Sequence, residues 1–132
     1  MRRSWLEKSA GKAASLLAHE GQHALDDFNG VGVAAMQQRT TALARGGAVT
    51  PAIVEQAGWE VSIAKESRGY LVQGLVLKEL GLVDPTKVGG PLLVAAQGAN
   101  DRASYDQVFR LLVSSPEGGY NPQGRSVEPF VL

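Results

Sequence analysis

The sequence predicts an all-α protein, and three observations lead to that prediction. A capping signal begins the longest segment, where Thr50-Pro51 offers an N-cap residue followed by a proline suited to the first helical position. The pairs Asn29-Gly30 and Gly46-Gly47 are typical helix ends. Only the short run from 91 to 96, PLLVAA, is ambiguous between helix and strand, so strand content is expected to be small or absent.

Two helices are expected in the N-terminal part of the chain. Ser4 and Glu7 have the spacing of a capping box, which places a first helix from Trp5 to about Phe28. A second helix is expected from 33 to 45, between the two glycine-containing stops.

A long apolar-rich segment then runs from Thr50-Pro51 to about Leu80. Because it contains Gly58, Gly69 and Gly74, it could form one helix or two.

The C-terminal part of the chain is expected to hold one more helix and an irregular tail. Ser104 and Gln107 are spaced as a capping box, which predicts a helix from Ser104 to Val113. The tail at 114–132 has three prolines and three glycines in 19 residues, so it is expected to be irregular.

Length and composition restrict the class of protein. The 132 residues are enough for a single domain, taken as 1–132, with one modest core. Lys plus Arg and Asp plus Glu both number 13, so neither nucleic acid nor an anionic membrane is an expected partner. The sequence has no run of about 18 apolar residues and no signal-peptide h-region after Met1, which favours a cytoplasmic location. It has no cysteine, so a transition metal must be held by His, carboxylate and water.

One segment, LLAHEGQHALDDF at 16–28, contains both histidines of the chain in an H-E-x-x-H pattern. Positions four apart on a helix differ by about 40° around its axis, so His19 and His23 can bind the same zinc ion. Glu20 is turned by about 100° from His19, where it could take a proton from a metal-bound water. Together the three side chains encode metal-assisted hydrolysis. The alternative is a solvated helix that carries the pattern by chance.

Two acidic residues follow the pattern closely. Asp26 and Asp27 lie three and four residues after His23. Either carboxylate could accept a hydrogen bond from a ligand imidazole and fix its tautomer, as zinc-bound histidines need. Both could equally be solvated acids in the last turn of the helix.

A third ligand must come from elsewhere in the chain. A catalytic zinc ion needs three protein ligands and an open position, and with no third histidine the remaining ligand must be Asp or Glu. Glu66 is preferred because it shares a helix face with apolar and aromatic residues, where an unpaired carboxylate costs free energy. Glu60, offset from Glu66 by about 240°, is the reserve candidate. Glu66 could instead be a surface acid paired with a neighbouring cation.

Two motifs carry a resemblance to a known family. AHEGQHALDD resembles the active-site helix of the zincin metallopeptidases, and a glutamate on a downstream helix makes the chain similar to the gluzincin branch. Residues 66–73, ESRGYLVQ, followed by LKELG at 77–81, resemble the E-A-x-A-Y-x-x-Q glutamate helix of many small members. The resemblance covers about 14–81.

The resemblance implies a zinc-dependent peptidase that acts on a peptide or protein. Its zinc ligands would be His19, His23 and Glu66, within a helical core at 1–82, and Glu20 would be the general base. Gluzincins usually carry a β-sheet before the active-site helix, whereas only 18 residues precede His19 here. The resemblance is therefore to a minimal or truncated member.

The histidine that usually stabilises the oxyanion in gluzincins has no counterpart in this chain. A phenol can donate a hydrogen bond to a developing oxyanion, so a tyrosine could take this role. Tyr70 is taken as the catalytic candidate, with Tyr105 and Tyr120 as the others. Ordinary packing is the alternative role for each.

A second family with H-E-x-x-H, the peptide deformylases, is disfavoured. Residues 30–37, GVGVAAMQ, resemble its G-x-G-x-A-A-x-Q motif. In that family the motif precedes the histidines and the third ligand is a cysteine, whereas here the order is reversed and cysteine is absent. A helix end followed by a helix start is the better interpretation.

The alternative to a peptidase is a non-catalytic zinc-binding or purely structural helical protein. From 52 to 82, apolar residues occupy two helix faces, and a helix that is apolar on two sides needs two packing partners. In so short a chain one partner could be a second copy, so a homodimer is expected.

Overall fold

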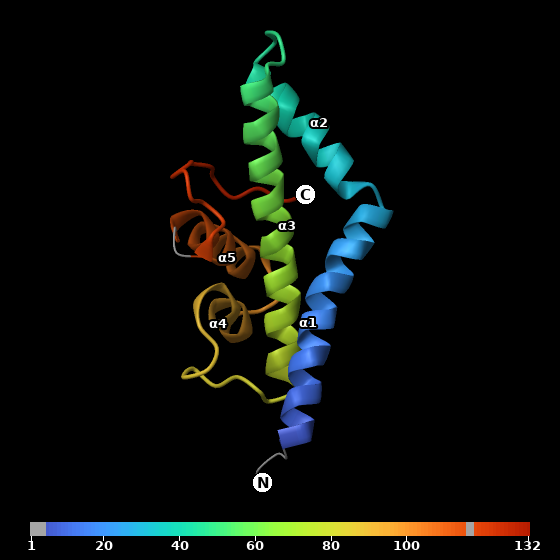
Figure 1. Ribbon diagram of the computed structural model, residues 1–132, viewed down its shortest axis with the longest axis vertical. Helices are drawn as coiled ribbons and strands as arrows, with labels where there is room; N and C mark the ends of the chain where they lie inside the picture. Colours follow the sequence, from blue (N-terminus) through green and yellow to red (C-terminus); the bar gives the residue numbers. More distant parts are fainter. Residues whose placement is uncertain (1–4, 116–117) are drawn as a thin grey trace.

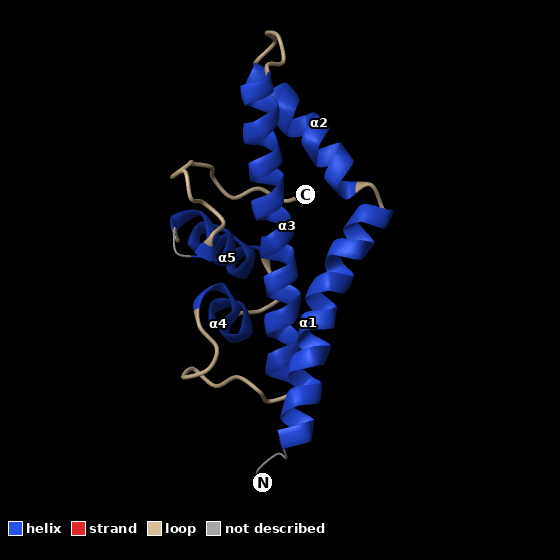
Figure 2. Ribbon diagram, in the orientation of Figure 1, coloured by secondary structure: helices blue, strands red, loops and turns tan. Residues whose placement is uncertain are grey.

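The computed structural model describes residues 5–115 and 118–132, and over these residues the protein is all-α, as predicted. They form five helices and no strand (Figure 2). The helices are α1 (Trp5–Phe28), α2 (Val31–Ala44), α3 (Pro51–Glu79), α4 (Gly90–Gln97) and α5 (Arg102–Ser114). No helix of the described ranges is both long and apolar enough to cross a membrane.

The long helix α3 is the centre of the fold. Figure 1 shows α1 and α2 along one side of α3, and α4 and α5 along the other. The chain after α5 turns back and crosses α3 again before it ends. Every other helix therefore packs against α3, which fixes their relative positions.

The predicted stop between the first two helices is confirmed. Gly30 has a φ of 68°, a left-handed conformation that a residue with a Cβ adopts only with strain. The chain can therefore leave α1 and begin α2 at once. As a result α2 begins at Val31, two residues earlier than the sequence predicts.

The segment after Thr50 forms one helix rather than two. The Thr50 hydroxyl accepts a hydrogen bond from the backbone N–H of Ile53 at 3.3 Å, and Pro51 occupies the first turn, as predicted. Gly74 does not break α3, because it lies where α4 approaches closely: a Cβ there would be 2.6 Å from the Ala95 Cβ. Helix packing therefore outweighs the low helix propensity of glycine.

The C-terminal helices differ from the prediction in detail. The ambiguous run at 91–96 is helical and lies within α4. The predicted capping box at Ser104 is wrong, because α5 begins at Arg102 and its N-cap is Asp101. The Asp101 carboxylate accepts from the Ser104 N–H at 2.8 Å, and this hydrogen bond lowers the pKa of Asp101. The Ser4 end of the other predicted capping box lies outside the described residues.

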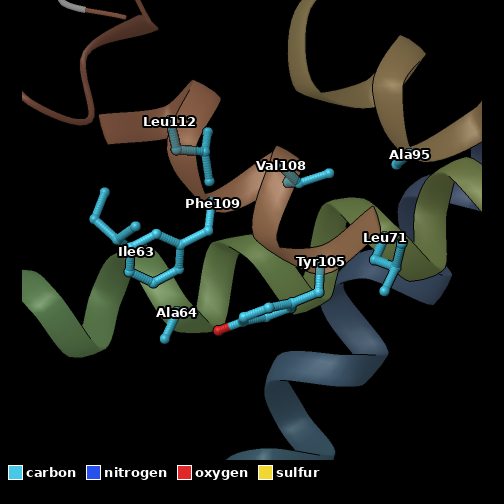
Figure 3. Packing of buried hydrophobic residues seen from close by; sticks show 8 residues of the cluster. All are labelled: Ile63, Ala64, Leu71, Ala95, Tyr105, Val108, Phe109 and Leu112. Carbon is cyan, nitrogen blue, oxygen red and sulfur yellow. The ribbon is translucent and has the colours of Figure 1, made fainter. Parts of the chain in front are cut away.

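The main hydrophobic core lies between α3 and α5. Figure 3 shows Phe109 and Leu112 of α5 facing Ile63 of α3, with Val108 packed nearby. Phe109, Ile63 and Val108 are fully buried. Helices α4 and α5 thus stabilise one face of α3 and leave its other face to α1 and α2.

A helix with two apolar faces needs two packing partners, and α3 finds both within the same chain. Its two apolar faces are therefore no longer a reason to expect a second copy. Most of the exposed large apolar side chains of the described residues lie on α1 instead. Six large apolar side chains of α1 are between 52% and 89% exposed: Trp5, Leu6, Leu16, Leu17, Leu25 and Phe28.

Candidate metal centre

The packing of α1 against α3 brings both histidines to one carboxylate. The His19 and His23 Nε2 atoms are 3.1 Å apart. Glu66 of α3 places its Oε2 3.3 Å from His19 Nε2 and its Oε1 2.8 Å from His23 Nε2. The preferred third residue is thus beside the histidines, whereas Lys65 and Arg68, the cations near it in the chain, pair with Asp27 and Asp26.

The three distances suit a shared metal ion. With bonds of 2.0–2.1 Å, two ligand atoms of a tetrahedral zinc ion lie about 3.3 Å apart. The N–N and N–O separations of 3.1 and 3.3 Å are close to that value. The third, 2.8 Å, is the shortest of the three and is an ion-pair contact, so a proton carried by His23 Nε2 would have to be released when a metal binds. Two imidazoles and a carboxylate form a donor set that suits zinc.

Burial of the three groups is uneven. The His19 side chain is only 7% exposed, whereas those of His23 and Glu66 are 21% and 26% exposed. The group therefore lies at the edge of the protein, with His19 on the inner side. This placement leaves the outer side accessible to water, as a catalytic site requires.

Gly69 allows His19 to lie against α3. A Cβ at position 69 would lie 2.6 Å from His19 Nε2 and 2.7 Å from its Cδ2, which is much closer than any real contact. The imidazole therefore occupies the space that a side chain at 69 would fill. Gly69 was noted in the sequence only as a weak point of the helix, and its role appears only in the packing.

Gln73 orients the same imidazole. The Nδ1 of His19 lies 2.9 Å from the Gln73 Oε1. An amide oxygen only accepts, so Nδ1 carries the hydrogen and the Nε2 lone pair points toward His23 and Glu66. This is the hydrogen bond that a metal-binding histidine needs from its surroundings. The sequence suggested Asp26 or Asp27 for this role, whereas the structure gives it to Gln73, the last residue of the ESRGYLVQ motif.

The two aspartates do not orient either histidine. Asp26 is buried, and its Oδ1 is 3.0 Å from the Arg68 guanidinium and 3.0 Å from the Gln22 amide. Asp27 is an exposed acid that pairs with Lys65 at 2.9 Å. Both carboxylates instead join α1 to cationic side chains of α3.

The reserve ligand, Glu60, lies elsewhere. Its side chain is buried and forms an ion pair with the Arg39 guanidinium of α2. The Arg39 guanidinium also lies over the Phe130 ring, 4.4 Å from its centroid. Glu60 therefore joins α2 to α3, and the grouping of two histidines with a carboxylate includes Glu66 and not Glu60.

The general-base candidate and the candidate tyrosines lie in different surroundings. Glu20 is exposed on α1, next in the chain to His19. The Tyr70 ring meets the His19 ring edge-on at 4.9 Å between centroids, and its hydroxyl is 2.6 Å from that of Tyr120. Tyr105 is buried in the core, where burial raises its pKa, and its hydroxyl donates to the Phe130 carbonyl.

Comparison with known proteins adds no relative. No family model matches the chain, and neither a curated protein nor a solved structure gives a significant match. What can be concluded about function therefore depends on the site itself.

Proposed function

We propose that the protein is a zinc-dependent metallopeptidase, with His19, His23 and Glu66 as the metal ligands. The observation that carries this proposal is the meeting of two imidazole nitrogens and one carboxylate at distances of 2.8–3.3 Å. Gly69 and Gln73 give independent support, since one provides the space for the His19 ring and the other fixes its tautomer.

In this proposal zinc, when bound, supplies the Lewis acid that activates a water molecule and polarises the scissile carbonyl. Glu20 accepts the proton of the attacking water and passes it to the leaving amine. Glu20 is exposed and is next in the chain to His19, so its carboxylate is accessible to water. Tyr70 donates to the developing oxyanion. Its hydroxyl already contacts that of Tyr120, so donation to a substrate requires it to leave this partner.

Metal analysis tests the ligand set. We expect about one zinc ion per chain in the native protein, and loss of zinc in both His23→Ala and Glu66→Ala. The matched control is Glu60→Gln, which removes a carboxylate from the same helix and should keep zinc. Zinc retained in Glu66→Ala but lost in Glu60→Gln would refute the assignment of Glu66.

Hydrolysis tests the reaction. The native protein should cleave members of a mixed peptide library, with fragments identified by mass spectrometry. Glu20→Gln should keep zinc and lose the cleavage, because the amide cannot accept the proton. A native protein that binds stoichiometric zinc and cleaves no peptide would refute catalysis while leaving the metal site intact.

A second candidate is a non-catalytic zinc-binding or structural protein that forms a homodimer through α1. It is favoured by the six exposed apolar side chains on that helix. Leu6, Leu17 and Phe28 are 11 residues apart, so they follow one side of a straight helix. Large apolar side chains that remain exposed along one helix in this way are typical of a surface that contacts another protein. The homodimer and the cytoplasmic location remain predictions.

A further inference from the structure

The segment after α5 adds a residue to the edge of the metal centre. The hydroxyl of Tyr120 lies 3.4 Å from Glu66 Oε2 and 2.6 Å from the Tyr70 hydroxyl. Tyr120 lies outside the 1–82 range to which the sequence assigned the zinc-binding core. Its position next to Glu66 depends only on how the C-terminal segment folds back onto α3.

Hydrogen bonds to the main chain hold this part of the segment in place. The Trp59 indole N–H of α3 donates to the Tyr120 carbonyl at 2.7 Å. The buried Asn121 side chain donates to the carbonyls of Val113 and Arg125, each at 2.8 Å, and accepts from the Arg125 N–H at 2.7 Å. The Tyr120 ring is therefore placed by the backbone around it and not by its own hydroxyl.

The direction of the hydrogen bonds follows from counting protons. A carboxylate only accepts, so the single hydroxyl proton of Tyr120 points to Glu66. Tyr120 must then accept the proton of Tyr70 at its own oxygen. The Tyr70 ring in turn packs edge-on against His19, so the two tyrosines connect the carboxylate to the inner histidine.

We propose that Tyr120 is a positioning residue of the metal centre, which holds Glu66 Oε2 and so orients the carboxylate toward the two histidines. This inference rests on the proposed ligand set. Carboxylates that bind metals are themselves usually hydrogen-bonded, and losing such a partner typically weakens metal binding 10–100-fold. A separation of 3.4 Å is longer than a normal O–H···O bond, so the lower end of that range is expected here.

The test compares zinc affinity in the native protein, Tyr120→Phe and Tyr105→Phe. Tyr105→Phe is the matched control, because it removes a phenol hydroxyl that bonds to the Phe130 carbonyl and not to Glu66. Competition with a chelator of known affinity should give a zinc Kd about 10-fold higher in Tyr120→Phe and unchanged in Tyr105→Phe. Thermal unfolding of the metal-free proteins reports any general loss of stability.

Cobalt(II) provides a readout that a purely structural role would not change. If Tyr120 orients the carboxylate, the visible absorption bands of the Co²⁺-loaded protein should shift in Tyr120→Phe and stay unchanged in Tyr105→Phe. Native zinc affinity and native bands in Tyr120→Phe would overturn the inference while leaving the ligand set intact. A native protein that binds no zinc would overturn both the proposed function and this inference.

Discussion

The strongest test of the site is a single added methyl group at Gly69. In Gly69→Ala the new Cβ would lie 2.6 Å from His19 Nε2, whereas ordinary contacts are 3.4–4 Å. The imidazole must therefore move by about 1 Å, several times the ±0.2 Å tolerance of a metal–ligand distance. We expect zinc affinity to fall about 100-fold, at the upper end of the range for disturbed metal surroundings.

Gly58→Ala is the matched control for this variant. It makes the same change in the same helix, and a Cβ at position 58 meets nothing within 4 Å. Alanine is favoured over glycine in a helix by up to about 1 kcal/mol, which corresponds to a rise of about 4 °C in the melting temperature. The metal-free Gly58→Ala protein should be more stable, and its zinc affinity should be unchanged.

Isothermal titration with zinc and thermal unfolding of the metal-free proteins together test whether the His19 ring packs closely against α3 at Gly69. In Gly69→Ala the gain in helix propensity should be offset by the cost of overpacking, about 1–3 kcal/mol, so its stability should be equal to or below that of the native protein. If Gly69→Ala bound zinc as tightly as Gly58→Ala and gained the same stability, the close packing of His19 on α3 would be refuted.

Four further predictions address other contacts. Gln73→Leu should weaken zinc binding about 10-fold in chelator competition, because His19 loses its acceptor, and an unchanged Kd would contradict this. Arg39→Met should lower the free energy of unfolding by about 3 kcal/mol in urea, because it leaves the buried Glu60 carboxylate without its cation, yet it should not change zinc content. Phe109→Ala should cost about 4 kcal/mol in the same assay, and a loss under 1 kcal/mol would show that the core tolerates the cavity. Leu17→Lys should convert a homodimer to a monomer in sedimentation equilibrium, and a native protein that is monomeric at micromolar concentration would rule out that assembly.

Local signals predicted the helices well because each depends on a few neighbouring residues. Thr50 and Pro51 begin α3 as expected, and Gly30 ends α1 in the conformation that glycine favours. The error at the start of α5 is of a different kind. Ser104 had the right spacing for an N-cap, but Asp101, three residues earlier, provides the cap, and the Ser104 hydroxyl accepts from the Ala99 N–H. Two competing polar residues cannot be ranked by spacing alone.

The surroundings of the site could not be predicted in the same way. Gln73 and Tyr120 lie 54 and 101 residues after His19 in the chain, so only the packing of α1 and of the C-terminal segment on α3 brings them near it. Asp26 and Asp27 were plausible partners for the histidines because they are close to them in sequence, yet they pair with Arg68 and Lys65 of α3. Closeness along the chain was thus a poor guide to which side chains meet.

By itself, the sequence determined the all-α class, the helix carrying His19 and His23, and Glu66 as the preferred third residue, because helical periodicity fixes which side chains share a face. The tertiary structure decided the rest. It paired Glu60 with Arg39, placed Glu66 beside the histidines, and used Gly69 to let an imidazole lie against α3. The physical reason is that contact between helices depends on where small residues allow close approach, and a pattern within one helix does not contain that information.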